Sequence, residues 1–250
     1  MFGITLYYCN MPRAFPFLSR HFSFHQCVHW KRFAFSCFWK EKKRIVYTIR
    51  MFISNALEES IIIMGLNIHL HTFPTLETER LILRQLAATD AQDCFLFLSD
   101  EETMRYYDPA PMTQLEQAEK SIERHRRRFA QHEALRWGII LKGENRVIGN
   151  CGYSWDVDNR HATLSYILSK HYWNKGIMTE ALTAIIQFGF EHIHLHRIEA
   201  QVAYPNLASA RLLEKLGFQE EGRLRDRQYA NNQFVDEIIF ALINTNNVDG

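Results

Sequence analysis

The sequence predicts a single mixed α/β domain formed by about residues 72–244 of the 250-residue chain. Segments with the apolar pattern of strands are interleaved with segments whose apolar residues recur at helical spacing, in the order β-α-α-β-β-β-α-β-α-β-β. No repeat or low-complexity tract interrupts this order. The chain is 47% hydrophobic and 23% charged, close to the globular average, so its composition is sufficient for a packed core.

The first elements of this domain are a strand and a helix. The segment "TERLILRQL", which begins at Thr78, predicts a strand with Leu81 and Leu83 on one face. Thr89 and Asp90 are suited to cap a helix that runs through "AQDCFLFLSD".

A second helix and a β-hairpin come next. The polar segment 113–131 predicts the helix, because Thr113 and Glu116 have the spacing of a capping box. The short sequence "GEN" then separates two strand-like runs, which indicates a hairpin. The hairpin strands and the strand, helix and strand that follow are expected at 135–142, 146–155, 161–168, 177–194 and 197–203.

The last helix and a closing ribbon complete the expected domain. Asn206 suits the N-cap of a helix over 207–216, and Gly217 suits the left-handed position after its end. Residues 218–243 predict a two-stranded ribbon that turns at Asn231-Asn232.

The N-terminal segment, residues 1–63, differs from the rest of the chain. Its first 50 residues contain nine Lys or Arg against one acidic residue, so they carry a charge of +8 and residues 51–250 carry −7. They also hold 13 of the 33 aromatic residues and show no useful strand or helix period. We expect this segment to be disordered or outside the native protein, with translation starting at Met51 or Met64; a targeting segment and a basic membrane-binding or nucleic-acid-binding arm are the alternatives.

The cellular setting expected from the sequence is the cytoplasm. No apolar stretch is long enough to span a bilayer, and no apolar run after a charged start indicates a secretory signal. The five cysteines show no C-x-x-C spacing, and Cys94 and Cys151 fall in segments expected to be core.

A turn that could bind a phosphate group lies between the strand expected at 161–168 and the helix expected at 177–194. Lys175 and Gly176 stand where the first amides of the helix lack partners, and such a helix end binds phosphate groups well. The turn matches neither the Walker pattern nor the dinucleotide G-x-G-x-x-G pattern. A plain strand-to-helix turn remains the alternative on local physics alone.

Three segments carry a family resemblance: "YWNKGIMTEAL", "HRIEAQV" and "NLASARLLEKLGFQEEGRLR". In this order and spacing, and with "LETERLILR" before them, the chain resembles the GNAT superfamily of acetyl-CoA-dependent N-acetyltransferases over about residues 73–243. Within the superfamily it is similar to the ribosomal-protein N-terminal acetyltransferases of the RimJ and RimL type. The resemblance implies a mixed central sheet with a splayed coenzyme-binding strand pair, flanked by about four helices.

The resemblance also implies where acetyl-CoA binds. The family's pyrophosphate loop, Q/R-x-x-G-x-G/A, corresponds to Trp173, Asn174, Lys175, Gly176, Ile177 and Met178, so Trp173 and Met178 depart from the pattern. Amides from Lys175 to Thr179 are expected to hold the diphosphate. The backbone of Ile167, Leu168 and Ser169 is expected to pair with the pantetheine arm, with the amide near Leu168 stabilising the oxyanion.

Two residues at the start of the last helix have structural and functional interpretations. Structurally, Asn206 is a helix cap and Ser209 a first-turn residue. By resemblance, Asn206 contacts the coenzyme arm and Ser209 lies near the thioester sulfur as an acid for the thiolate, with Tyr166, Tyr204 or water as other donors.

The base that receives the proton of the amine is not fixed by the sequence. The ribosomal-protein branch has a proposed Glu where this chain has Gln228, an amide that cannot serve as a base. Glu220, Glu221 and Asp226 are nearby alternatives. An α-amine with a pKa of about 7.7–8 is already partly neutral near pH 7, so a positioned carboxylate or a water chain suffices.

The function expected is direct acetyl transfer from acetyl-CoA to a primary amine in a ternary complex, with a protein N-terminal α-amine of the ribosomal type as the acceptor. A small-amine or antibiotic acetyltransferase and a non-catalytic acyl-CoA sensor are the alternatives. "HIHLH" at 192–196 and "RHRRRF" at 124–129 are interpreted as helix-end histidines and a solvated helix face, so neither a metal nor direct nucleic-acid binding is expected. We expect a monomer or homodimer with no membrane partner.

Overall fold

The computed structural model describes residues 36–41, 44–49, 70–107, 109–156, 159–230 and 233–245. The chain divides into two compact units, Met1–Glu58 and Glu59–Gly250. The first unit contains β1 (Ser36–Glu41) and β2 (Arg44–Ile49), which pair antiparallel from Ser36 opposite Ile49. The sequence patterns did not predict these two strands. The rest of the N-terminal segment lies outside the described residues.

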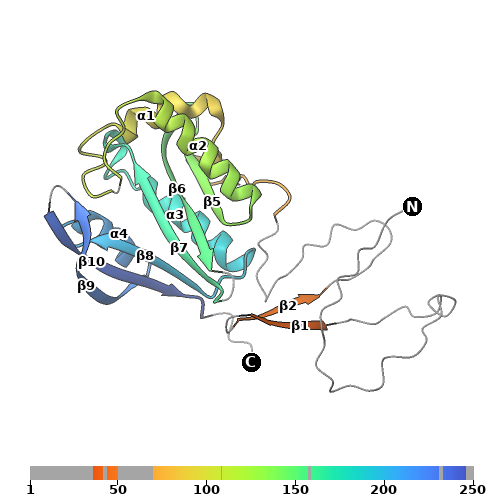
Figure 1. Cartoon of the computed structure of the whole chain (residues 1–250). Helices are drawn as coiled ribbons and strands as arrows, with labels where there is room; N and C mark the ends of the chain where they lie inside the picture. Colours follow the sequence, from red (N-terminus) through yellow and green to blue (C-terminus); the bar gives the residue numbers. More distant parts are fainter. Residues whose placement is uncertain are drawn as a thin grey trace, which may run out of the picture. The chain divides into compact units, whose positions relative to one another are not determined.

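The second unit is built on an eight-stranded sheet with the strand order β3-β4-β5-β6-β7-β8-β10-β9 (Figure 1). Every neighbouring pair is antiparallel except β7 and β8, which run parallel. The sheet is therefore mixed, as the sequence predicts. The strand bounds are β3 Leu76–Glu77, β4 Leu81–Gln85, β5 Ala134–Leu141, β6 Val147–Asp156, β7 His161–Leu168, β8 Arg197–Ala203, β9 Gln219–Ala230 and β10 Gln233–Ile243.

Four α-helices cover the two faces of this sheet (Figure 1). The helices α1 (Ala91–Leu98) and α2 (Leu115–Ala130) pack on one face, where they form an apolar cluster with Ile140 and Ile167 of the sheet. The helices α3 (Ile177–Glu191) and α4 (Leu207–Lys215) belong to the main core on the other face. In the described part of the chain, no helix is long and apolar enough to cross a membrane.

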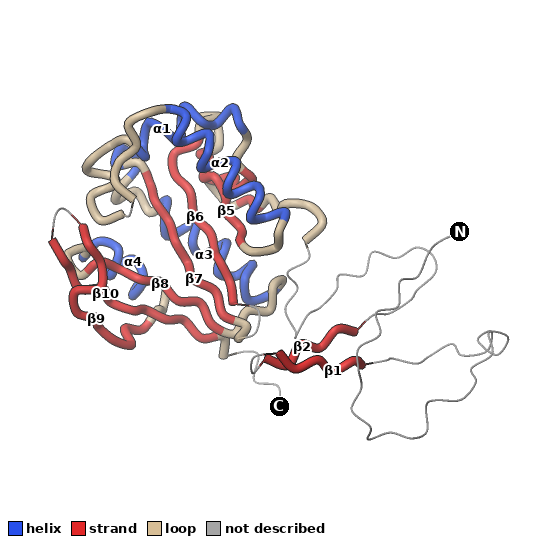
Figure 2. The backbone as a smooth tube through the Cα atoms, in the orientation of Figure 1, coloured by secondary structure: helices blue, strands red, loops and turns tan. Residues whose placement is uncertain are grey.

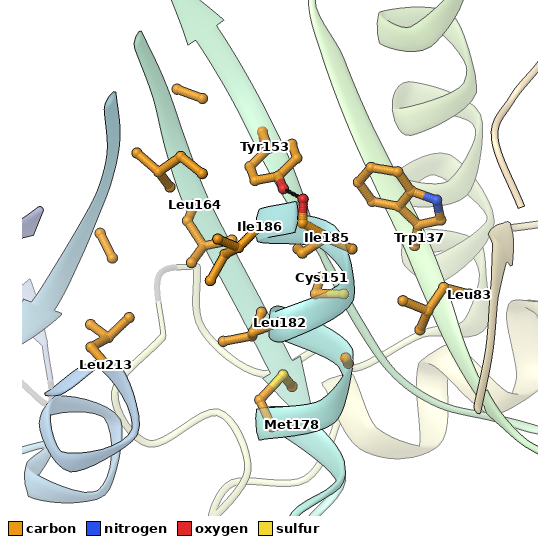
Figure 3. Packing of buried hydrophobic residues seen from close by; sticks show 14 of the residues in the cluster. Leu83, Trp137, Cys151, Tyr153, Leu164, Met178, Leu182, Ile185, Ile186 and Leu213 are labelled. Atoms are coloured by element: carbon orange, nitrogen blue, oxygen red, sulfur yellow. Dashed lines mark hydrogen bonds between the residues drawn. The ribbon is translucent and has the colours of Figure 1, made fainter. Parts of the chain in front are cut away.

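The main core lies between α3 and the centre of the sheet (Figure 3). Met178, Leu182 and Ile185 recur at helical spacing along α3 and are buried against the sheet. Tyr153 of β6 is also fully buried there, and its hydroxyl donates to the carbonyl of Ile185, so the one polar atom of this side chain is satisfied. This packing fixes α3, and with it the turn that precedes α3, against β6 and β7.

The observed elements follow the predicted order, with one strand that was not predicted, β3, and two local corrections. The α3 helix ends at Glu191, three residues before the predicted end, because the amides of Ile193 and Leu195 bond back to the carbonyls of Phe188 and Gly189 and close the turn. The α2 helix begins one residue later than the Thr113–Glu116 capping box predicts. Gln117, and not Glu116, is the residue whose side chain caps the helix: its oxygen accepts from the amides of Thr113 at 2.7 Å and Gln114 at 3.0 Å.

Other local predictions are confirmed. Leu81 and Leu83 of β4 are both fully buried. Asp90 is the N-cap residue of α1, although its carboxylate bonds to the amide of Ala87 in the preceding 3-10 turn rather than to α1 itself. Gly217 has φ +88° after α4, the left-handed conformation expected there. The ribbon of β9 and β10 is present, and its predicted turn at 231–232 lies outside the described residues.

Candidate functional site

A gap opens between β7 and β8 in the middle of the sheet. The two strands pair from His161 opposite Arg197 to Leu164 opposite Ala200, and no further, although both strands continue beyond these residues. Figure 2 shows the strands side by side at one end and apart at the other. Backbone groups of β7 beyond Leu164 therefore have no ladder partner on the β8 side, which is the arrangement that a bound chain-like ligand can complete.

The ladder between β6 and β7 determines which backbone groups face this gap. Ser169 N donates to Ile148 O at 2.9 Å, and successive residues of an antiparallel strand turn their amides alternately toward and away from the neighbour. The amide of Leu168 therefore faces away from β6, toward the gap. The Leu168 carbonyl accepts from Trp173 Nε1 at 2.8 Å, so the N–H is the group that Leu168 offers to a ligand.

The backbone groups of the other two predicted positions, Ile167 on β7 and Ser169 just after it, do not face the gap. The same alternation turns the backbone of Ile167 toward β6, and its side chain is buried beneath α1 and α2. Ser169 uses its N–H on Ile148 and its carbonyl as the acceptor for Tyr172 N at 3.0 Å. Of the three residues, Leu168 is thus the one whose backbone faces the gap.

The turn from Trp173 to Gly176 ends at an exposed helix N-terminus. Gly176 is the N-cap of α3 with φ +73°, a left-handed conformation that favours glycine. Glu180 N donates to Gly176 O at 3.1 Å, so the amides of Ile177, Met178 and Thr179 precede the first intrahelical bond. These amides and the helix dipole form a positive end that suits an anion.

Polar side chains of this turn are used within the turn itself. The indole of Trp173, which stands where the family pattern has Gln or Arg, anchors the turn to the end of β7 through Leu168 O. Lys175 Nζ donates to His171 O at 2.9 Å, and Asn174 has φ +57°. Lys175 and Asn174 are both exposed, so the cation of Lys175 remains at the surface beside the helix end.

The start of α4 faces β7 across the gap. Asn206 is the N-cap of α4, and its Oδ1 accepts from Ser209 N at 3.2 Å, as the sequence predicts for a cap. Ser209 Oγ lies 2.6 Å from the hydroxyl of Tyr166 on β7. This bond joins the two sides of the gap through a pair of hydroxyl groups.

The hydroxyl pair is neutral at physiological pH. Burial raises the pKa of Tyr166 to about 12, and the hydrogen bond between Tyr166 and Ser209 opposes this shift only in part. The phenol therefore keeps its proton near pH 7 and can donate to Ser209, which leaves the Ser209 proton free to point elsewhere. Local sequence patterns could not predict the contact between Tyr166 and Ser209, because the two residues are 43 positions apart.

The three carboxylates predicted as alternatives for the base, Glu220, Glu221 and Asp226, do not lie together in the structure. Glu221 binds Arg197, at the end where β7 and β8 are still paired, and Arg197 holds the pKa of Glu221 below its ordinary value. Asp226 and Glu220 are exposed on β9, the outermost strand of the sheet. Gln228 is half-buried opposite Val235.

One carboxylate that the sequence analysis missed lies next to the end of β8 at which β7 and β8 have parted. Glu237 of β10 pairs with Ala203, the last residue of β8, and is half-buried. Its neighbours Ile238 and Val202 are buried toward α3 and α4, so alternation places Glu237 on the opposite face of the sheet. Only the strand register reveals this position, because Glu237 is 28 residues beyond Ser209 in the sequence.

A hollow of about 940 Å³ lies near the end of β7. Its wall includes the segment after α1. Lys170, in the 3-10 turn that follows β7, holds this segment by ion pairs with Asp100 at 2.7 Å and Glu102 at 3.3 Å. The other lining residues are Ser99, Glu101, Arg105 and Gln233.

Comparisons with known proteins agree with this geometry. The family model for the acetyltransferase (GNAT) domain matches residues 80–219, more than half of the chain. A Bacillus licheniformis protein named "Uncharacterized N-acetyltransferase p20" is 38% identical over 170 residues, which cover 68% of this chain and 96% of that protein. The uS5-alanine N-acetyltransferase of Escherichia coli is 35% identical over 114 residues, or 45% of this chain and 59% of the enzyme.

Solved structures extend the likeness to the fold. The crystal structure of the ribosomal-protein-S5-alanine acetyltransferase from Vibrio fischeri has a TM-score of 0.63 and 25% identity, over 69% of this chain and 97% of that one. The parted strands of the sheet and its four helices agree with the family match. The chain belongs to the GNAT acetyltransferase family and is an N-acetyltransferase.

Proposed function

We propose that this N-acetyltransferase moves the acetyl group of acetyl-CoA to the α-amine at the N-terminus of a protein, by direct transfer in a ternary complex. The observation that carries the proposal is the parting of β7 and β8 beside the helix N-terminus at Gly176. The gap exposes a backbone amide to an acyl group, and the helix end supplies a site for phosphate.

The residues present fit acetyl-CoA in three places. The amides from Lys175 to Thr179 suit the diphosphate, and the flanking Trp173 and Asn174 shape the turn that presents them. The Leu168 amide suits the acyl and pantetheine end, because it faces the gap. Asn206 uses its oxygen for the cap, so its amide nitrogen is the end that can contact the coenzyme arm.

Transfer itself needs little from the protein beyond positioning. The Leu168 N–H stabilises the negative charge that develops on the thioester oxygen when the amine attacks the carbonyl carbon. Ser209 donates its proton to the sulfur as the carbon–sulfur bond breaks, and Tyr166 supports Ser209 through their hydrogen bond. The proton that the amine loses returns through solvent to Ser209, so that in net terms it ends on the thiol. The two described cysteines of this domain, Cys94 and Cys151, are buried in the core, so the path runs through no thiol of the domain.

Glu237 is our candidate for receiving the amine proton. Its side chain lies on the face opposite α3, next to the end of β8 at which the two strands have parted. An α-amine has a pKa of about 7.7–8, so a carboxylate that acts through a water is sufficient near neutral pH.

Two acceptor classes fit different observations. Relatives named for acetylation of a ribosomal protein support a protein N-terminus, and they also support a cytoplasmic setting. A small amine is the second candidate, because three carboxylates (Asp100, Glu101 and Glu102) and two cations (Arg105 and Lys170) line the hollow, which leaves it with a net negative charge.

Turnover with a panel of acceptors tests the proposal. N-terminal peptides beginning with Ala or Ser, polyamines and an aminoglycoside are each supplied with acetyl-CoA, and free thiol release is measured above spontaneous hydrolysis. Acetylation of peptides, removed by blocking their α-amine, supports the proposed acceptor. Turnover with polyamines alone moves the assignment to the second class. If none of the acceptors in the panel gives thiol release above spontaneous hydrolysis, both acceptor classes are contradicted.

A further inference from the structure

The segment that precedes β4 reaches across the fold to the candidate phosphate site. Arg80 Nη1 donates to the carbonyl of Lys175 at 2.9 Å, and Arg80 Nε donates to Glu180 at 2.6 Å. A Cβ added at Gly176 would lie 3.4 Å from Arg80 Nη2. One guanidinium therefore touches the turn before α3, the first turn of α3 and the space beside the N-cap.

Glu180 makes this contact necessary on electrostatic grounds. A carboxylate in the first turn of a helix is favourable toward the dipole, but it repels an anion at the same helix end. Thr78 Oγ1, Arg80 N and Arg80 Nε all donate to Glu180, at 2.5, 2.8 and 2.6 Å. Burial alone would raise the pKa of Glu180, yet these bonds lower it below its ordinary value, so the group stays charged and its charge is matched by Arg80.

We infer that Arg80 is a positioning residue for the coenzyme diphosphate. Through the Lys175 carbonyl it holds the turn in the shape that presents the amides of α3, and by pairing with Glu180 it keeps the helix end attractive to an anion. This inference rests on the proposed function of the turn and extends it to the segment "LETERLILR", whose polar residues the transfer chemistry does not use. The two residues are 100 positions apart, so sequence spacing alone does not suggest the pair.

Affinity for coenzyme A in calorimetric titrations tests the inference. We expect Arg80→Gln to raise the Kd about tenfold, since the variant loses a charge-assisted bond and leaves Glu180 unmatched. The double variant Arg80→Gln/Glu180→Gln removes both charges, and we expect it to bind at least about threefold tighter than Arg80→Gln alone. Such recovery distinguishes a charge effect from mere loss of packing.

The donor substrate supplies a second readout. S-acetylpantetheine lacks the diphosphate, so Arg80→Gln should leave its kcat/KM unchanged while kcat/KM for acetyl-CoA falls. Arg84→Gln is the matched control: Arg84 also lies on this segment and pairs with a carboxylate, Asp90, at 2.7 Å, but it has no contact with the turn among the described bonds. We expect Arg84→Gln to keep wild-type coenzyme affinity.

Three outcomes overturn the inference, and they differ from failure of the proposed function. If Arg80→Gln keeps the wild-type affinity for coenzyme A while Gly176→Asp, a variant of the phosphate turn itself, loses affinity, Arg80 has no positioning role and the proposed phosphate site still holds. Equal losses with acetyl-CoA and S-acetylpantetheine, or no recovery in the double variant, reduce Arg80 to a structural residue. A wild-type protein that binds no coenzyme A removes the proposed site and the inference together.

Discussion

The two ends of the β7–β8 pair are built in opposite ways. At the paired end, Arg197 of β8 bonds to Glu199 of the same strand at 2.6 Å and to Glu221 of β9, so charged side chains join β8 to β9. At the open end, the groups that face each other are an amide and two hydroxyls, those of Leu168, Tyr166 and Ser209. Both ends belong to the same two strands, yet only the first is closed by the ladder.

This difference shows how the fold separates stability from chemistry. The ladder from His161 to Leu164 holds the two strands together at the paired end, and the α3 core holds β7 in place beyond that point. Neutral donors at the open end can then stabilise developing negative charge without a fixed charge that would bind the ground state equally well. Variants at the open end should change binding and turnover, and variants at the paired end should change stability.

The largest expected effect is at the phosphate turn. Gly176→Asp should raise the Kd for coenzyme A by roughly a hundredfold or more, because a carboxylate would stand beside the diphosphate at the helix N-terminus. Gly176→Asn is the matched control, since Asn has the same shape, tolerates the left-handed conformation and carries no charge. Calorimetric titration of both folded variants checks this, and equal affinities for the two would remove the phosphate assignment.

A smaller effect is expected at the hydroxyl pair. Ser209→Ala should lower kcat about tenfold with little change in coenzyme Kd, because a proton donor to the thiolate acts mainly in the transition state. Tyr166→Phe should lower kcat in the same direction. If Tyr166 acts through Ser209, the double variant will lose no more than the larger single loss. Wild-type kcat in Ser209→Ala would return Ser209 to a helix residue, with Tyr204 or water as donor.

At the paired end we expect a modest loss of stability and no loss of binding. Arg197→Met should lower the melting temperature by a few degrees while the coenzyme Kd stays at the wild-type value. Arg197 lowers the folded-state pKa of Glu221, so its contribution is present above the ordinary value of 4.5 and is lost as the pH falls through the lowered one. The difference in melting temperature should therefore narrow below pH 4.5. A weakened coenzyme affinity in Arg197→Met would mean that the two ends are not separable.

The sequence predicts the elements of this comparison better than their contacts. The strands at 161–168 and 197–203 and the cap at Asn206 were predicted with the observed bounds, because local patterns and capping chemistry decide them. The bonds from Tyr166 to Ser209 and from Arg80 to Glu180 were not, because they depend on how α3 and α4 pack against the sheet. Family resemblance located the turn at Gly176, but the strand register was needed to find that Leu168, and neither Ile167 nor Ser169, turns its backbone toward the gap.

The smallest expected effect concerns residues 1–63. Both apolar clusters of the described residues are formed by residues from Leu70 onward, and the eight-stranded sheet begins at Leu76. A chain that starts at Met64 therefore keeps every described element that contributes to the core and to the gap. We expect it to be at least as soluble and as thermally stable as the full chain, with equal coenzyme A affinity. The sequence of the N-terminal segment is aromatic and basic, and it has no period that would place its rings on one face, so we expect it to add sticky surface and sites for proteolysis. Thermal melting and calorimetric titration of the two chains side by side check this. A melting temperature several degrees lower in the shorter chain would show that the N-terminal segment is an accessory element of the domain.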